Sequence, residues 1–129
     1  EDEYEGNIRR ILNFGHTIGH AYEQLLGYGT ITHGEAVGLG MIAAGRLSEH
    51  LGVATPGLVH EITSALRSLG LPIVAPQNLS PADVIDAARR DKKSEGDGVR
   101  FVLLRTVGVP ELRKVSWQEV EVGVFAGDI

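Results

Sequence analysis

Residues 13–35 read NFGHTIGHAYEQLLGYGTITHGE and contain three of the five histidines of the chain. Apolar residues recur at helical spacing over 16–26, which predicts a helix that ends at the following glycine-rich turn. His16 and His20 stand one turn apart on one face of this helix. His33 lies in a Gly- and Thr-rich loop at the start of the next helix, and a helix hairpin would return it toward the first two. The stretch therefore predicts two consecutive helices that bring three imidazoles together.

Capping signals and apolar periodicity place the other elements. Ser80 and Pro81 are a helix cap followed by a proline at the first helical position, and Ser116 is a similar cap for a final helix with Val120 and Val124 on its inner side. In chain order the sequence predicts a helix over 2–12, the helix 16–26, a long helix over 34–51 whose glycines permit close helix contacts, a helix from Pro56 to Gly70, a helix from Pro81 to about Asp91, strands over 101–104 and 111–115, and a short helix from Trp117. The predicted fold class is mostly α and multi-helical, with one small β-hairpin.

Length and composition limit the function classes. The chain has 129 residues, of which 43% are hydrophobic, enough for one core and one domain. A formal charge of -5 argues against a nucleic-acid partner. The nearly uncharged stretch 36–45 is far shorter than the roughly 20 residues that a membrane helix needs, and the absence of cysteine fits a reducing compartment. We expect a soluble, cytoplasmic protein.

Without cysteine, any metal site must use His, Asp or Glu. Two imidazoles at i and i+4 project from one helix face and can serve as metal ligands, although exposed histidine pairs with no such role have the same spacing. The alternative for His33 is a polar residue that faces water. Glu23 and Glu35 are the local candidates for a third, carboxylate ligand. We favour an exposed helix position for Glu23, and for Glu35 a favourable charge at a helix N-terminus.

Four cations could meet a phosphate or carboxylate of a small acidic metabolite: Arg9, Arg10, Lys92 and Lys93. Lys92 and Lys93 follow a predicted helix whose C-terminal end attracts cations in any case. Composition alone leaves both interpretations open.

The stretches NFGHTIGHAYE at 13–23, GYG at 27–29 and HGEAV at 33–37 closely resemble the signature of the 3-dehydroquinate synthases. Further matching positions are Asp2, Glu3, Glu5 and Arg9 before the signature, and DKK at 91–93 with FVLL at 101–104 after it. The resemblance covers about residues 2–105. Asn7 departs from it, since the family often has glycine there.

The resemblance implies the fold of the dehydroquinate synthase family and its chemistry. The family cyclises 3-deoxy-arabino-heptulosonate 7-phosphate to 3-dehydroquinate with release of phosphate, a phosphorus–oxygen lyase reaction of the shikimate pathway of aromatic amino-acid biosynthesis, with NAD and a divalent metal, usually zinc or cobalt. It implies that His16 and His33 bind the metal and that the third ligand is a glutamate upstream of residue 1. The residues expected to contact substrate or take part in catalysis are His20, Arg9, Asn13, Lys92 and Lys93. Between the two lysines we favour Lys92.

The resemblance also implies how the chain is organised. Residues 1–129 are expected to be a partial C-terminal metal- and substrate-binding domain, without the N-terminal domain to which NAD mainly binds. This part is expected to be inactive alone. The family implies a homodimer in the complete enzyme. Three alternatives remain: another sugar phosphate cyclase, a metal-dependent alcohol dehydrogenase of the glycerol dehydrogenase type, and a non-catalytic helical module. Arg9, Asn13 and the DKK segment, occurring together, favour the dehydroquinate synthase.

Overall fold

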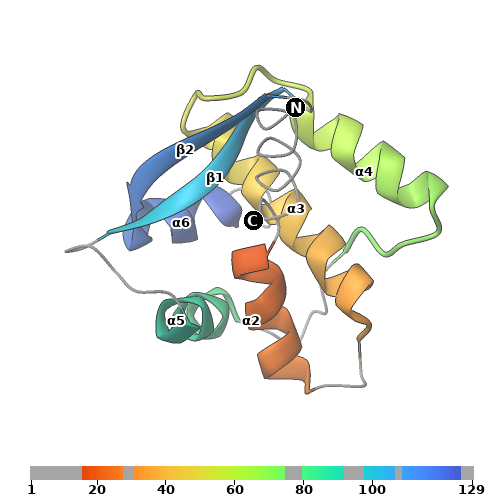
Figure 1. Ribbon diagram of the computed structural model, residues 1–129, viewed down its shortest axis with the longest axis vertical. Coiled ribbons are helices and arrows are strands. Elements are labelled where there is room, and N and C mark those ends of the chain that lie inside the picture. The colour runs from red at the N-terminus through yellow and green to blue at the C-terminus, as the bar shows by residue number, and fades with distance from the viewer. Residues whose placement is uncertain (1–15, 28–30, 75–79, 92–97, 107–108, 126–129) are drawn as a thin grey trace, which may run out of the picture.

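Helix α3 (His33–His50) is the longest element and contacts α2, α4, α6 and β1 (Figure 1). The computed structural model describes residues 16–27, 31–74, 80–91, 98–106 and 109–125. The other elements in these ranges are α2 (His16–Leu26), α4 (Leu58–Ser68), α5 (Pro81–Asp91), β1 (Gly98–Thr106), β2 (Val109–Ser116) and α6 (Trp117–Val124). The predicted fold class, mostly helical with one β-hairpin, is confirmed. The helix predicted over 2–12 lies outside the described residues.

Helices α2, α5 and α6 begin where the sequence predicts them to begin. Ser116 forms a capping box with Glu119, in which each side chain accepts a hydrogen bond from the other residue's backbone N–H, both at 3.0 Å. Ser80 Oγ accepts from the backbone N–H of Asp83 at 3.1 Å. These caps satisfy backbone donors that the first helical turn leaves unpaired, and they are encoded locally. For that reason the sequence alone locates them.

Helix α4 starts two residues later than Pro56, the predicted start. Gly57 has a φ of 111°, which is not a helical conformation. It is the N-cap residue, but it has no side chain that could accept a hydrogen bond from the first turn. Glu49 of α3 takes over this function, because its Oε2 accepts from the backbone N–H groups of Gly57 at 3.2 Å and Val59 at 2.8 Å. The start of α4 is therefore fixed by a side chain from a different helix.

The hairpin strands are longer than predicted and pair antiparallel, with Phe101 opposite Arg113 and Leu103 opposite Glu111. Residues 99, 101 and 103 of β1 pack into the larger of two hydrophobic clusters, whereas Val102 and Leu104 pack into the smaller one. Because both faces of β1 are covered, its apolar run is continuous and not alternating. Ser48 ties β1 to α3: its buried Oγ accepts from the Leu104 backbone N–H at 3.1 Å and donates to Ala44 O at 2.9 Å.

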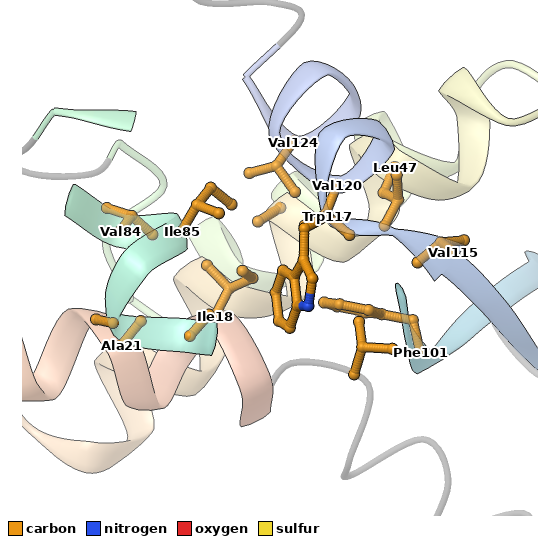
Figure 2. Close-up of a cluster of buried hydrophobic side chains, with 14 of the residues drawn as sticks. Ile18, Ala21, Leu47, Val84, Ile85, Phe101, Val115, Trp117, Val120 and Val124 are labelled. Carbon is orange, nitrogen blue, oxygen red and sulfur yellow. The ribbon is translucent and has the colours of Figure 1, made fainter. Parts of the chain in front are cut away.

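The larger cluster joins α2, α3, α5, α6 and the hairpin. The Trp117 indole lies among its labelled side chains in Figure 2 and meets Phe101 edge-on, with ring centroids 6.4 Å apart. Arg89 of α5 stacks its guanidinium over the indole, 5.8 Å from the ring centroid. Val120 and Val124 face this cluster, as predicted from their spacing. The cluster fixes α2 and α3 relative to the rest of the molecule.

Within the described ranges, every helix is too short or too polar to cross a membrane.

Candidate metal centre

His16 and His33 are the first residues of two adjacent helices, α2 and α3 (Figure 1). Thr32 caps α3: its Oγ1 accepts from the Glu35 backbone N–H at 3.0 Å, and Glu35 Oε1 accepts from the Thr32 N–H at 2.9 Å. Because of this capping box, α3 begins one residue earlier than predicted, and His33 stands inside its first turn. Both imidazoles are solvent-exposed at helix N-termini.

The two imidazoles lie at a separation similar to that of two ligands of one metal ion. Their ring centroids are 5.8 Å apart, with the ring planes inclined by 59°. An imidazole bound to zinc has its centroid about 3 Å from the ion, so two imidazoles on one tetrahedral ion have centroids about 5 Å apart. The predicted convergence of His16 and His33 through a helix hairpin is thus present. A third side chain restricts the rotation of the His33 ring.

Glu23, near the end of α2, supplies that side chain. Its Oε2 lies 3.1 Å from His33 Nδ1, and its side chain is only 8% exposed, compared with 69% for His33. The prediction that Glu23 is an ordinary exposed helix residue is therefore wrong. The signal that could have found its position is the spacing of seven from His16, which puts both residues on one face of α2.

Gly19 sets the distance between the two helices that carry these residues. A Cβ added to Gly19 would lie 2.7 Å from the backbone oxygen of Ala36 and 3.1 Å from the Val37 Cα. Only glycine at this position allows the α3 backbone to approach so closely. The close approach brings the start of α3 within hydrogen-bonding reach of Glu23.

The carboxylates near the histidines do not complete a three-ligand site. Glu35 is engaged in the capping box, which confirms its predicted place at a helix N-terminus. Glu23 meets the Nδ1 side of His33. In the described part of the chain, no group of three or more His, Cys, Asp or Glu side chains is arranged to hold a metal ion. Among the described residues, His16 and His33 are the pair whose separation suits two ligands of one metal ion.

His20 lies one turn after His16 on α2 and is half-buried. Arg9, Asn13, Lys92 and Lys93, the other residues that the sequence singles out, lie outside the described residues. Helix α5, which ends immediately before Lys92, packs against α2.

Comparison with known proteins places the chain in a family. The family described as 3-dehydroquinate synthase C-terminal matches residues 1–94. The chain belongs to the 3-dehydroquinate synthase family. The 3-dehydroquinate synthase of Desulforamulus reducens is 44% identical over 114 residues, 88% of this chain and 32% of the relative. That of Acidithiobacillus ferrooxidans is 48% identical over 107 residues, 83% of this chain and 29% of the relative. The chain spans about a third of the length of these 3-dehydroquinate synthases.

Solved structures show the same arrangement of elements as this member of the 3-dehydroquinate synthase family. A 2-deoxy-scyllo-inosose synthase complexed with carbaglucose-6-phosphate, NAD+ and Co2+ superimposes with a TM-score of 0.77 at 29% identity, covering 89% of this chain and 33% of that one. The 2-epi-5-epi-valiolone synthase of Streptomyces hygroscopicus, solved with NAD+ and Zn2+ bound, gives a TM-score of 0.72 at 23% identity, covering 88% of this chain and 31% of that one. The second similarity concerns the fold alone.

Proposed function

We propose that residues 1–129 form part of the C-terminal metal- and substrate-binding domain of a 3-dehydroquinate synthase, which converts 3-deoxy-arabino-heptulosonate 7-phosphate to 3-dehydroquinate and phosphate. The observation that carries the proposal is the pairing of His16 and His33, 5.8 Å apart at the starts of two adjacent helices, in a chain of this family. A pair of neutral imidazoles suits zinc or cobalt. The third ligand in the proposal is a carboxylate from outside the described residues.

The metal, when bound, would polarise substrate hydroxyls and lower the cost of removing a proton from them. His20 is the residue of α2 proposed to relay that proton, since an imidazole has an unperturbed pKa close to neutrality. It stands one turn from His16, on the same face of the helix. A substrate held by the metal would therefore lie within reach of a proton acceptor on the same rigid element.

Arg9, Asn13 and Lys92, with Lys93 as its alternative, are proposed to hold the anionic and hydroxyl groups of the substrate. An arginine can grip a phosphate or carboxylate with two parallel hydrogen bonds, whereas a lysine acts as a point charge. The packing of α5 against α2 supports the lysine assignment, because Lys92 directly follows α5 in the chain. Positioning of this kind supplies much of the rate enhancement in a reaction whose steps occur within one substrate.

NAD would supply the transient oxidation that makes phosphate elimination possible. The presence of NAD+ and Co2+ in the 2-deoxy-scyllo-inosose synthase structure supports both cofactors for this chain. In the proposal NAD is held mainly by an N-terminal domain, and two copies of the complete enzyme form a homodimer.

The deciding experiment measures phosphate release from 3-deoxy-arabino-heptulosonate 7-phosphate with NAD, with and without a chelator. It uses the protein as its gene encodes it. We expect chelator-sensitive release with 3-dehydroquinate as the product. A folded, metal-loaded and NAD-bound protein that releases no phosphate would refute the proposal.

A second candidate is a sugar phosphate cyclase that makes a different carbocycle, favoured by the TM-score of 0.77 to 2-deoxy-scyllo-inosose synthase. The identity of 44% to a 3-dehydroquinate synthase, against 29% to the inosose synthase, supports the first candidate. Product analysis with several sugar phosphates, including glucose 6-phosphate, separates the two. Formation of an inosose in place of 3-dehydroquinate would establish the second.

A further inference from the structure

Glu23 is the one Asp, Glu, Lys, Arg or His side chain that is buried among the described side chains, where Thr17 and Ser48 are also buried and polar. Removing a carboxylate from water is costly unless the group is well hydrogen-bonded. The cost is largest for a charged group, and it is tolerated where the group has a partner. The residue that Glu23 contacts therefore indicates the role of this buried carboxylate.

That partner is His33, ten residues later on the neighbouring helix, with Nδ1 3.1 Å from Glu23 Oε2. A carboxylate in its ionised form accepts hydrogen bonds and has no proton to donate, so such a carboxylate pairs with the imidazole tautomer that carries its proton on Nδ1. In a neutral imidazole with its proton on Nδ1, the lone pair available to a metal is on Nε2. A carboxylate at this distance from Nδ1 favours the tautomer with its proton on Nδ1 and restricts the orientation of the ring.

Stability alone gives a weak reason for this contact. The His33 side chain is 69% exposed, and a pair with one exposed partner contributes little to the free energy of folding. A carboxylate that holds a metal-binding histidine has a larger effect on metal affinity, roughly 10- to 100-fold. The His33 side chain is exposed, and its ring centroid lies 5.8 Å from that of His16, so an ion that reaches one imidazole is close to the other.

We infer that Glu23 is a positioning residue, which holds the His33 imidazole with its proton on Nδ1 so that Nε2 binds the metal. The inference rests on the proposed function in so far as His33 is a metal ligand. Glu23 itself does not touch the metal or the substrate. Glu23 is itself buried near the end of α2, and Gly19 allows α3 to come close enough for the contact.

The test measures the dissociation constant of Co2+ by competition with a chromophoric chelator, together with the visible absorption spectrum of the bound cobalt. The protein is used as its gene encodes it, as wild type, Glu23→Ala and Glu23→Gln. We expect Glu23→Ala to bind Co2+ roughly 10- to 100-fold more weakly. Glu23→Gln should bind closer to wild type, because the amide oxygen can still accept the Nδ1 proton.

Glu49→Ala is the matched control. Glu49, like Glu23, is a glutamate in a helix. Its carboxylate accepts two hydrogen bonds from backbone N–H groups at the start of α4. Its loss should reduce stability and leave the cobalt affinity and spectrum unchanged. A general loss of stability would therefore affect both alanine variants, whereas loss of His33 orientation would affect only Glu23→Ala.

The tautomer of His33 gives a readout that needs no metal. Two-bond 1H–15N correlation spectra of the metal-free protein should show the Nδ1–H form in wild type and Glu23→Gln, and a shift toward Nε2–H in Glu23→Ala.

Wild-type cobalt affinity and an unchanged tautomer in Glu23→Ala would overturn the inference and leave the metal centre intact. Weakened cobalt binding in a protein that makes no 3-dehydroquinate would support the inference and refute the proposed function. A wild type that binds no cobalt would overturn both.

Discussion

The two candidate ligands occupy equivalent positions, each at the first residue of a helix. The backbone N–H groups at a helix N-terminus carry a partial positive charge, which repels a metal dication and favours anions. Negative charge near the start of α3 counteracts this, since Glu35 lies within its first turn and Glu23 reaches it from α2. A further carboxylate, the third ligand in our proposal, would complete the compensation. The chemistry of the two helix starts thus favours an acidic third ligand over another histidine.

Substitution of four of the five histidines gives the first prediction at this scale. His16→Ala and His33→Ala should abolish metal retention and turnover, because each removes one of the two imidazoles that converge. His50→Ala and His60→Ala remove exposed side chains at the end of α3 and in α4, and should be nearly silent. Metal content by mass spectrometry and phosphate release check both. An equal loss in all four variants would contradict the site assignment.

The sequence predicts the histidine pair better than it predicts the environment of that pair. His16 and His33 stand out by residue type and by their resemblance to a family signature. Glu23 does not, because the burial of a helix residue depends on which neighbour covers it, and the contact of Glu23 with α3 is not visible in its own segment. A helical face can be deduced from spacing, but the tertiary contact that buries it cannot.

Elements with local capping signals are predicted to within a residue. Helix α2 ends before Gly27, and α6 starts after the Ser116 cap. The two larger differences have causes that lie far away in the sequence. Glu49 caps α4 across a loop, and strand pairing extends β1 and β2 beyond their apolar runs. Long-range hydrogen bonds of this kind leave no periodic signal in the segment that receives them.

Gly19→Ala is the prediction that belongs to the element scale. The new methyl group would meet the Ala36 backbone oxygen at 2.7 Å, so α2 and α3 must separate. We expect a loss of about 1–3 kcal/mol in stability, reduced by the better helix propensity of alanine, and weaker metal binding because His33 moves away from Glu23. Amide hydrogen exchange in α2 and α3, with a cobalt titration, measures both effects.

Gly34→Ala is the control for that substitution. It lies in the same helix pair, but apart from its chain neighbours and the backbone of its own helix no atom lies within 4 Å of the added Cβ. Its stability should equal or exceed that of the wild type, since alanine costs less than glycine in a helix. If Gly19→Ala behaved like Gly34→Ala in both measurements, the close approach of the helices would have no bearing on the site.

At the scale of the whole molecule, α3 separates two hydrophobic clusters. The larger cluster contains Leu39, Ala43 and Leu47 of α3, and the smaller contains Ile42 and Ala44. Helix α4 packs on the side of the smaller cluster, and α2 on that of the larger (Figure 1). Both candidate ligands belong to α2 and α3, so their relative position depends mainly on the larger cluster.

Two isoleucines, one in each cluster, test this division with identical chemistry. Ile18 of α2 and Ile62 of α4 are both buried, and truncating either to alanine should cost about 2–5 kcal/mol. Ile18→Ala leaves its cavity two residues from His16, so α2 can shift and cobalt affinity should fall. Ile62→Ala leaves its cavity beside Gly45, three turns along α3 from His33, and should lower stability while the folded protein binds cobalt as the wild type does.

Hydrogen exchange and cobalt titration well below the unfolding temperature separate the two effects. Equal losses of cobalt affinity would mean that the metal centre depends on the whole core, because α3 would then transmit a disturbance from either face to its first turn.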